Sequence, residues 1–248
     1  GAEGADFFFV YAKTSEKDGK KGISAFIVER DMGVKVENIY NLMGTRGGGT
    51  GRIVFRNVEA PAENLVGEVD GGAKIFNTMM VPERMTSASG ALGMGRAAVE
   101  IAAGYSTNRE AFGQKIKNFE GVSFRIADAV MKLDAARSLI YTSACGCDSG
   151  LDMRRNVSEA KRFATEAAWD AINHAMQVLG GIGYTDIYPV ERYLRDCRLS
   201  MIWTGSNEIM NLLIQHEYYR ELAAGREQAR DVEKDAPGWD KEGEKIYK

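Results

Sequence analysis

The chain has 248 residues, of which 44% are hydrophobic and 27% are charged, and its formal net charge is −3. A chain of this length can bury a sizeable core, and its slightly acidic balance gives no reason to expect binding to nucleic acid or to a membrane surface. Its four prolines exclude collagen-like and proline-rich classes, no apolar run is long enough to span a bilayer, and no signal peptide is visible.

Residues 1–69 carry β signals. An apolar, aromatic run at residues 6–12 is of strand length, a polar segment at 14–22 turns the chain, and residues 23–28 return, which predicts a hairpin. The expected strands are residues 6–12, 23–28, 34–36 and 52–58. Because residues 1–12 look like the middle of a sheet, we expect the natural chain to begin earlier.

A glycine-rich segment, residues 44–51, separates the last two of these strands. It resembles a phosphate-binding loop, but it lacks the Lys-Ser/Thr ending of such loops, and no helical pattern follows it directly. A flexible loop between strands is therefore the favoured interpretation, ahead of an independent nucleotide site.

From about residue 70 the apolar residues follow helical spacing. Pro82 should kink or restart the first helix, and Gly90, Gly93 and Gly95 should permit close approach of neighbouring helices. The expected helices are about residues 73–107, 120–148, 155–179 and 190–224, the last broken near residues 203–205. The predicted fold is therefore α+β: a partial antiparallel β-domain at residues 1–69, an antiparallel four-helix bundle at 70–224 and a flexible, charged tail at 225–248.

Cysteine and histidine are too few to indicate a metal site. Cys145, Cys147 and Cys197 are odd in number and show no disulfide pattern, which favours a reducing compartment. His174 and His216 lie in separate helical patterns. We expect inert thiols, structural histidines and no metal.

Three short segments combine glycine with fixed donors, aromatic residues or acids where helices should begin or end. They are Asn108–Lys115, Gln177–Tyr184 and Trp203–Glu208. Helix ends expose unpaired backbone groups and a partial charge, so they suit ligands that carry phosphate. Three such segments predict a cofactor that lies across several helix ends.

Together these segments resemble motifs of the acyl-CoA dehydrogenases. The resemblance also includes residues 58–67 and 192–198, and it extends to about residue 222. It implies that the bundle and the later part of a central β-domain are present, while the strands with the main flavin-ring contacts precede residue 1. It further implies FAD, an acyl-CoA substrate, an electron-transferring flavoprotein as acceptor, a dimer or tetramer, and a location in a bacterial cytoplasm or, less favoured, the mitochondrial matrix.

The resemblance also assigns the catalytic base. Many members carry a glutamate where this chain has Thr204, which follows Trp203, and threonine cannot act as a base at neutral pH. Isovaleryl- and long-chain-type members carry it instead before an arginine on the first bundle helix, which points to Glu83, with Arg84, Trp203 and Thr204 on the substrate side. The local sequence by itself favours a solvated Glu83–Arg84 pair in the first turn of a helix that starts after Pro82, and only the resemblance, with the glutamate missing at residue 204, favours Glu83 as the base.

The expected FAD contacts also come from the resemblance. They are Arg109, Phe112, Gln177, Gly180 and Gly181, which would meet a flavin bound mainly by a neighbouring subunit, with Ser206 and Glu208 as further contacts. The guanidinium of Arg109 suits phosphate, and the glycines allow close backbone approach. The alternatives are a surface charge at residue 109 and a plain helix C-cap at 177–181.

The implied activity is flavin-dependent α,β-dehydrogenation of an acyl-CoA thioester, in which Glu83 removes the α-proton and hydride passes to FAD. Two alternatives remain: an acyl-CoA oxidase on the same fold, and a non-catalytic helical assembly module that lost the chemistry.

Overall fold

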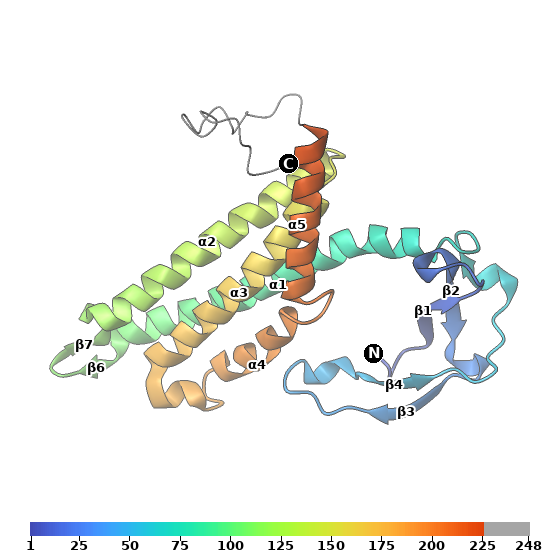
Figure 1. The fold of residues 1–248 in the computed structure, drawn as a ribbon. Coiled ribbons are helices and arrows are strands. Elements are labelled where there is room, and N and C mark those ends of the chain that lie inside the picture. The colour runs from blue at the N-terminus through green and yellow to red at the C-terminus, as the bar shows by residue number, and fades with distance from the viewer. Residues whose placement is uncertain (226–248) are drawn as a thin grey trace, which may run out of the picture.

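The computed structural model describes residues 1–225. The expected charged tail, residues 225–248, lies outside this range except for its first residue. Figure 1 shows short strands on one side and a group of long helices on the other. This arrangement is the predicted α+β architecture, whereas the division into two domains at residue 69 stays a prediction.

The first strands form the predicted hairpin. β1 (Phe7–Lys13) pairs antiparallel with β2 (Ile23–Glu29), and β5 (Leu65–Val66) joins the other edge of β2. β3 (Lys35–Ile39) and β4 (Gly51–Val54) form a second antiparallel pair with an irregularity between Val36 and Asn38. β5 was not predicted, because two residues are too few to show a period. The strand expected at residues 52–58 ends early, at Val54.

Short 3-10 turns connect these elements. They are η1 (Gly19–Gly22), η2 (Arg30–Met32), η3 (Arg46–Gly48), η4 (Ala62–Asn64), η5 (Ile116–Asn118) and η6 (Gly180–Tyr184).

The glycine-rich segment is a loop between β3 and β4, as predicted, and it docks on a helix of the bundle. A Cβ atom at Gly44 would overlap the backbone of Arg195, and the Thr45 amide donates to Asp196 Oδ1 at 2.6 Å. Glycine is required at residue 44 because only it permits so close an approach.

Five helices follow the strands. They are α1 (Gly72–Asn108), α2 (Glu120–Asp148), α3 (Arg154–Leu179), α4 (Val190–Ser200) and α5 (Asn207–Ala224). The expected break near residues 203–205 separates α4 from α5. A hairpin of β6 (Glu110–Ala111) and β7 (Gln114–Lys115) joins α1 to α2 and was not foreseen.

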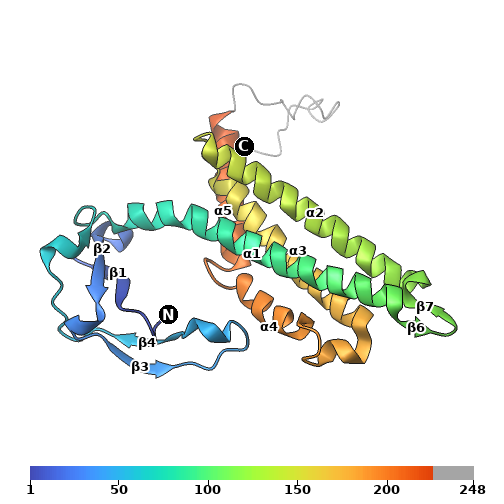
Figure 2. The ribbon, with the colours of Figure 1, turned by 180° about the vertical axis from the view of Figure 1, so that it is seen from behind.

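Pro82 does not restart the first helix, because α1 continues through it. A proline inside a helix removes one i→i−4 bond, and flanking turns can carry the helix past it. Figure 2 shows α1 changing direction in its first half, so a bend replaces the restart.

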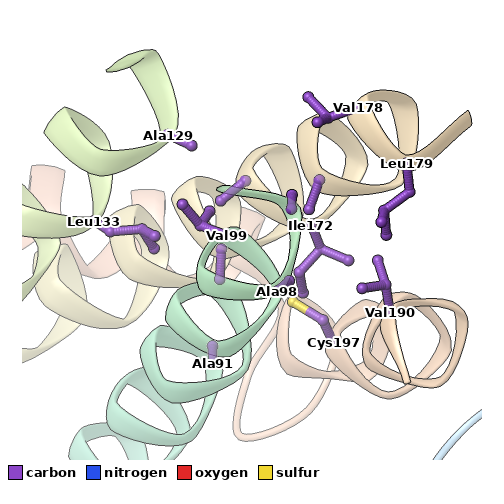
Figure 3. Close-up of a cluster of buried hydrophobic side chains, with 14 residues drawn as sticks. Ala91, Ala98, Val99, Ala129, Leu133, Ile172, Val178, Leu179, Val190 and Cys197 are labelled. Carbon is purple, nitrogen blue, oxygen red and sulfur yellow. The ribbon is translucent and has the colours of Figure 1, made fainter. Parts of the chain in front are cut away.

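Helix α3 is central and contacts α1, α2, α4 and α5. Its buried face is rich in alanine, which lets the neighbouring backbones come close. Figure 3 shows the main core cluster, to which α1, α2, α3 and α4 contribute Val99, Leu133, Ile172 and Val190 respectively. This core fixes where the ends of α3, α4 and α5 lie.

Of the three glycines expected at contacts between helices, only Gly95 lies at such a contact. A Cβ at Gly95 would lie 2.8 Å from Leu133 Cδ2 and 3.1 Å from Ala168 Cα, whereas at Gly90 and Gly93 it would meet no atom of the described chain within 4 Å. The expectation for Gly90 and Gly93 was therefore wrong for contacts within this chain, because both lie on the exposed face of α1.

Candidate functional site

The turn between α4 and α5 has an unusual backbone. Thr204 and Gly205 both have positive φ values, 54° and 90°. Positive φ is common for glycine but strained for a β-branched residue such as threonine, and strain of this kind tends to occur at functional sites. The Asn207 amide donates to the Met201 carbonyl at 3.0 Å, which closes the turn.

Helix α1 holds this turn from one side. Arg84, which is 8% exposed, donates from Nε to the Thr204 carbonyl at 3.2 Å, and Trp203 Nε1 donates to Ser87 Oγ at 2.6 Å. Burial lowers the pKa of the Arg84 guanidinium, and the charge of Arg154 lowers it further. The structure therefore brings Arg84, Trp203 and Thr204 together, whereas their role on the substrate side stays a prediction.

Glu83 is exposed on the same turn of α1. It precedes Arg84 and lies one helical turn before Ser87, so Glu83 and Ser87 share a face of the helix. Among the residues that the structure describes, its carboxylate forms no hydrogen bond or ion pair. The alternative of a helix-start pair is wrong, because α1 begins at Gly72, well before Glu83.

Helix α3 holds the turn from the other side through a residue that the motifs did not reveal. Lys161 is fully buried, and its Nζ donates to the Gly205 carbonyl at 3.0 Å and to Asn207 Oδ1 at 2.9 Å. Asn207 Nδ2 donates to Thr165 Oγ1 and Glu166 Oε1 at 3.1 and 3.2 Å. Burial, followed by repulsion from Arg84, lowers the pKa of Lys161 to about 8.

A sequence signal for Lys161 was present. It lies at helical spacing with Val157, Ala164 and Ala168, in the stripe that α3 buries. A lone lysine inside an apolar stripe indicates a buried charge with a specific partner.

A pocket of about 330 Å³ opens beside the turn. It lies at the N-terminus of α5, where Ser206 is the N-cap residue and Glu208 is in the first turn. The hydrogen bond from Ser206, followed by the Glu208 amide, holds the pKa of the Glu208 carboxyl below its usual value. Arg198 lies with its guanidinium carbon 6.0 Å from the Trp169 ring centroid. The lining residues are Glu166, Trp169, Arg198, Met201, Ile202, Ser206, Asn207 and Glu208.

The remaining predicted cofactor residues form a second cluster. Arg109 follows the last residue of α1, and Phe112 and Gly113, with φ values of 51° and 80°, make the two-residue turn of the β6–β7 hairpin. Positive φ at both positions is typical of a type I′ turn. This turn exposes the Phe112 ring almost completely, at 96%.

Gln177 and Gly181 are exposed, and Gly180 ends α3 with φ of 65°. Figures 1 and 2 place the β6–β7 hairpin and the end of α3 at the bundle end that is remote from the strands. The structure therefore separates the predicted residues into two clusters. Glu83, Arg84, Trp203, Thr204, Ser206 and Glu208 lie at the α4–α5 turn. Arg109, Phe112, Gln177, Gly180 and Gly181 lie at the far end.

Each cluster offers groups that a bound cofactor could contact. The Thr204 hydroxyl is buried and has no hydrogen-bond partner among residues 1–225, so the turn retains an unused polar group. The far cluster offers a cation, an exposed aromatic ring and glycine backbone, and a Cβ at Gly180 or Gly181 would meet nothing within 4 Å. Over the same range no group of three potential metal-ligating side chains occurs, and no helix is long and apolar enough to cross a membrane.

Comparisons with known proteins agree on one family. Residues 70–219 match the family model for the acyl-CoA dehydrogenase C-terminal domain. An acyl-CoA dehydrogenase of Bacillus subtilis is 39% identical over 211 residues, which cover 85% of this chain and 56% of that protein. The structure of butyryl-CoA dehydrogenase from Megasphaera elsdenii superposes with a TM-score of 0.84 at 35% identity, over 87% of this chain and 56% of that one. A structure of an FAD complex of PigA superposes equally well, with a TM-score of 0.84 at 28% identity, over 88% and 57%. The chain thus spans about half the length of the relatives it matches.

Proposed function

Because the chain belongs to the acyl-CoA dehydrogenase family, we propose that the protein that carries it oxidises an acyl-CoA thioester to the 2,3-enoyl-CoA. FAD, when bound, would supply the acceptor for the electrons that leave the β-carbon. The observation that carries the proposal is the placement of Glu83 on the turn of α1 whose Arg84 and Ser87 bind residues 203 and 204.

Glu83 is the proposed base. The α-proton of a thioester is weakly acidic, so a carboxylate must take it while the β-carbon is oxidised. Thr204, at the other family position for the base, offers only a hydroxyl, which is no base at neutral pH. Glu83 has no ion-pair partner among the described residues that would compete for its carboxylate. In this arrangement Arg84 holds the turn at Thr204 and does not neutralise Glu83.

The residues proposed to hold FAD are those of the two clusters. Ser206 and Glu208 would meet it at the start of α5. By resemblance to the family, Arg109, Phe112, Gln177, Gly180 and Gly181 would meet the cofactor of a neighbouring subunit, and their place at the far end of the bundle, remote from the α4–α5 turn, is compatible with this role. The protein is therefore proposed to be a dimer or tetramer. A monomer mass by light scattering of the FAD-loaded protein would contradict this assembly.

The test of the base is Glu83→Gln in the FAD-loaded protein. The amide keeps the shape but cannot accept the proton, so bleaching of the flavin absorbance by acyl-CoA should slow at least about 100-fold, the lower range for a general base. The flavin absorbance itself should remain. Glu100→Gln, a change of an exposed glutamate farther along α1, is the matched control and should bleach at the wild-type rate.

The other outcomes separate the alternatives. If Glu83→Gln bleaches as fast as wild type, Glu83 is not the base. Hydrogen peroxide formed in proportion to substrate would identify an oxidase, whereas reduction of an electron-transferring flavoprotein would identify a dehydrogenase. A protein that purifies without flavin and binds none would be the non-catalytic assembly module.

A further inference from the structure

Lys161 is a buried charge whose hydrogen-bond partners carry no charge. Its ammonium is fully buried and contacts the Gly205 carbonyl and the Asn207 side-chain oxygen. Within residues 1–225 no carboxylate lies within ion-pair distance of it. A buried charge of this kind is costly unless its hydrogen bonds are made, so both partners must be held in place for the fold to keep it.

The partners of Lys161 lie in the α4–α5 turn, at Gly205, and directly after it, at Asn207. Arg84 on α1 donates to the Thr204 carbonyl, and Lys161 on α3 donates to the carbonyl of the next residue, Gly205. Two cations therefore bind two successive residues whose φ values are positive. Left-handed backbone at threonine is unfavourable by itself and persists only where the surroundings impose it. The two cations supply that constraint.

Lys161 also orients the first residue of α5. Its ammonium can only donate, so it fixes the oxygen of the Asn207 amide toward itself and leaves the amide nitrogen for Thr165 and Glu166. Asn207 lines the pocket that also contains Ser206 and Glu208. A single buried lysine thus links the strained turn to the pocket.

We propose that Lys161 is a positioning residue, which holds residues 203–207 in the conformation that the dehydrogenation requires without touching the reacting atoms. This inference rests on the proposed function of the same site. Loss of the ammonium would release the Gly205 carbonyl and the Asn207 amide together, which would move Trp203 and Thr204 relative to Glu83.

The hydrogen bonds that Lys161 donates to residues 205 and 207 should depend on pH, because the surroundings of the ammonium lower its pKa. The charged groups that face it are Arg84 on α1, Glu166 on α3 itself and Glu208 on α5. Burial and Arg84 bring its pKa to about 8, so the amine loses its charge as pH rises through this value. The turn should then loosen in the mildly alkaline range.

The first experiment uses the FAD-loaded protein. Lys161→Met removes the ammonium but keeps an unbranched side chain, and Lys161→Arg keeps a charge. Lys161→Met should lower the maximal rate of flavin bleaching by acyl-CoA at least about tenfold, as small misplacements of reacting groups do. The substrate concentration for half-maximal bleaching should change less, and Lys161→Arg should recover part of the rate. Lys132→Met, which removes an ion-paired lysine on α2 away from the turn, is the control and should bleach like wild type.

The second readout does not need catalysis. The part of the tryptophan emission that Trp203→Phe abolishes reports on the turn. In the wild type this emission should change between about pH 7 and pH 9, because the pKa of Lys161 is about 8. Lys161→Met should remove this change. The proposal would be overturned if Lys161→Met bleached the flavin at the wild-type rate. It would also be overturned if the Trp203 emission of Lys161→Met still changed with pH as it does in the wild type.

The two arms keep this inference separate from the proposed function. If no acyl-CoA bleaches the wild-type flavin, the proposed function fails, and the Trp203 titration alone decides the role of Lys161. If Lys161→Met does not fold, Lys161→Arg decides: its guanidinium stays charged between pH 7 and pH 9, so loss of the Trp203 transition supports the proposal, and a transition unchanged from the wild type overturns it.

Discussion

Gly95 is the position where a single methyl group should change the stability of the bundle most clearly. It lies where α1 crosses α2 and α3, and an added Cβ would be 2.8 Å from Leu133 Cδ2 and 3.1 Å from Ala168 Cα. The leucine methyl is the end of a flexible side chain and can move, but the backbone atom of Ala168 cannot move without shifting α3.

The expected magnitude follows from two opposing effects of Gly95→Ala. Replacing a helical glycine with alanine stabilises by up to about 1 kcal/mol through the backbone entropy of the unfolded chain. Overpacking a filled core destabilises by about 1–3 kcal/mol. Gly90→Ala on the same helix brings only the first effect, because open space surrounds its Cβ position.

The assay compares the two variants. Urea unfolding followed by circular dichroism should place the free energy of unfolding of Gly95→Ala about 1–3 kcal/mol below that of Gly90→Ala, since the propensity term cancels in the difference. In the double variant Gly95→Ala/Leu133→Ala the part of the penalty caused by Leu133 should disappear, so the two changes should not be additive. If Gly95→Ala stabilises as much as Gly90→Ala, the close approach of α1 to α2 and α3 is refuted.

Two further predictions concern a thiol and a carboxylate. Cys197 is fully buried, and burial raises the pKa of its thiol to about 11. A thiol reagent at neutral pH should therefore modify exposed Cys145 first and Cys197 only after unfolding, as peptide mass analysis would show; rapid modification of Cys197 in the native protein would contradict its burial. Asp70 receives hydrogen bonds from Lys17, Thr14 and Ser15, and that from Lys17 contributes most to lowering its pKa. A lowered folded-state pKa adds stability above the unfolded value of about 4, and this stability is lost as pH falls through the folded pKa. Asp70→Asn, which tolerates the positive φ at this position, should thus lower the urea midpoint at neutral pH, and the difference from wild type should shrink below about pH 4. A difference that stays constant with pH would show that the charge of Asp70 does not matter.

The sequence alone determined the features that depend on local periodicity and on motifs. The β1–β2 hairpin, α2 and the break between α4 and α5 all lie where apolar spacing and turn residues predicted them. The family followed from motifs that stand in a fixed order, and the comparisons confirmed it. Local signals were sufficient here because each element repeats its period over several residues.

Tertiary structure decided what depends on residues far apart in the chain. Only the packing of α3 places Lys161 against Gly205, which lies 44 residues later in the chain. Likewise, only the path of α1 separates Gly95, which meets α3, from Gly90, which faces outward. The same packing separates the predicted cofactor residues into two clusters. No period in one segment records which neighbour it meets, because burial and hydrogen bonding are settled by the elements that pack against it.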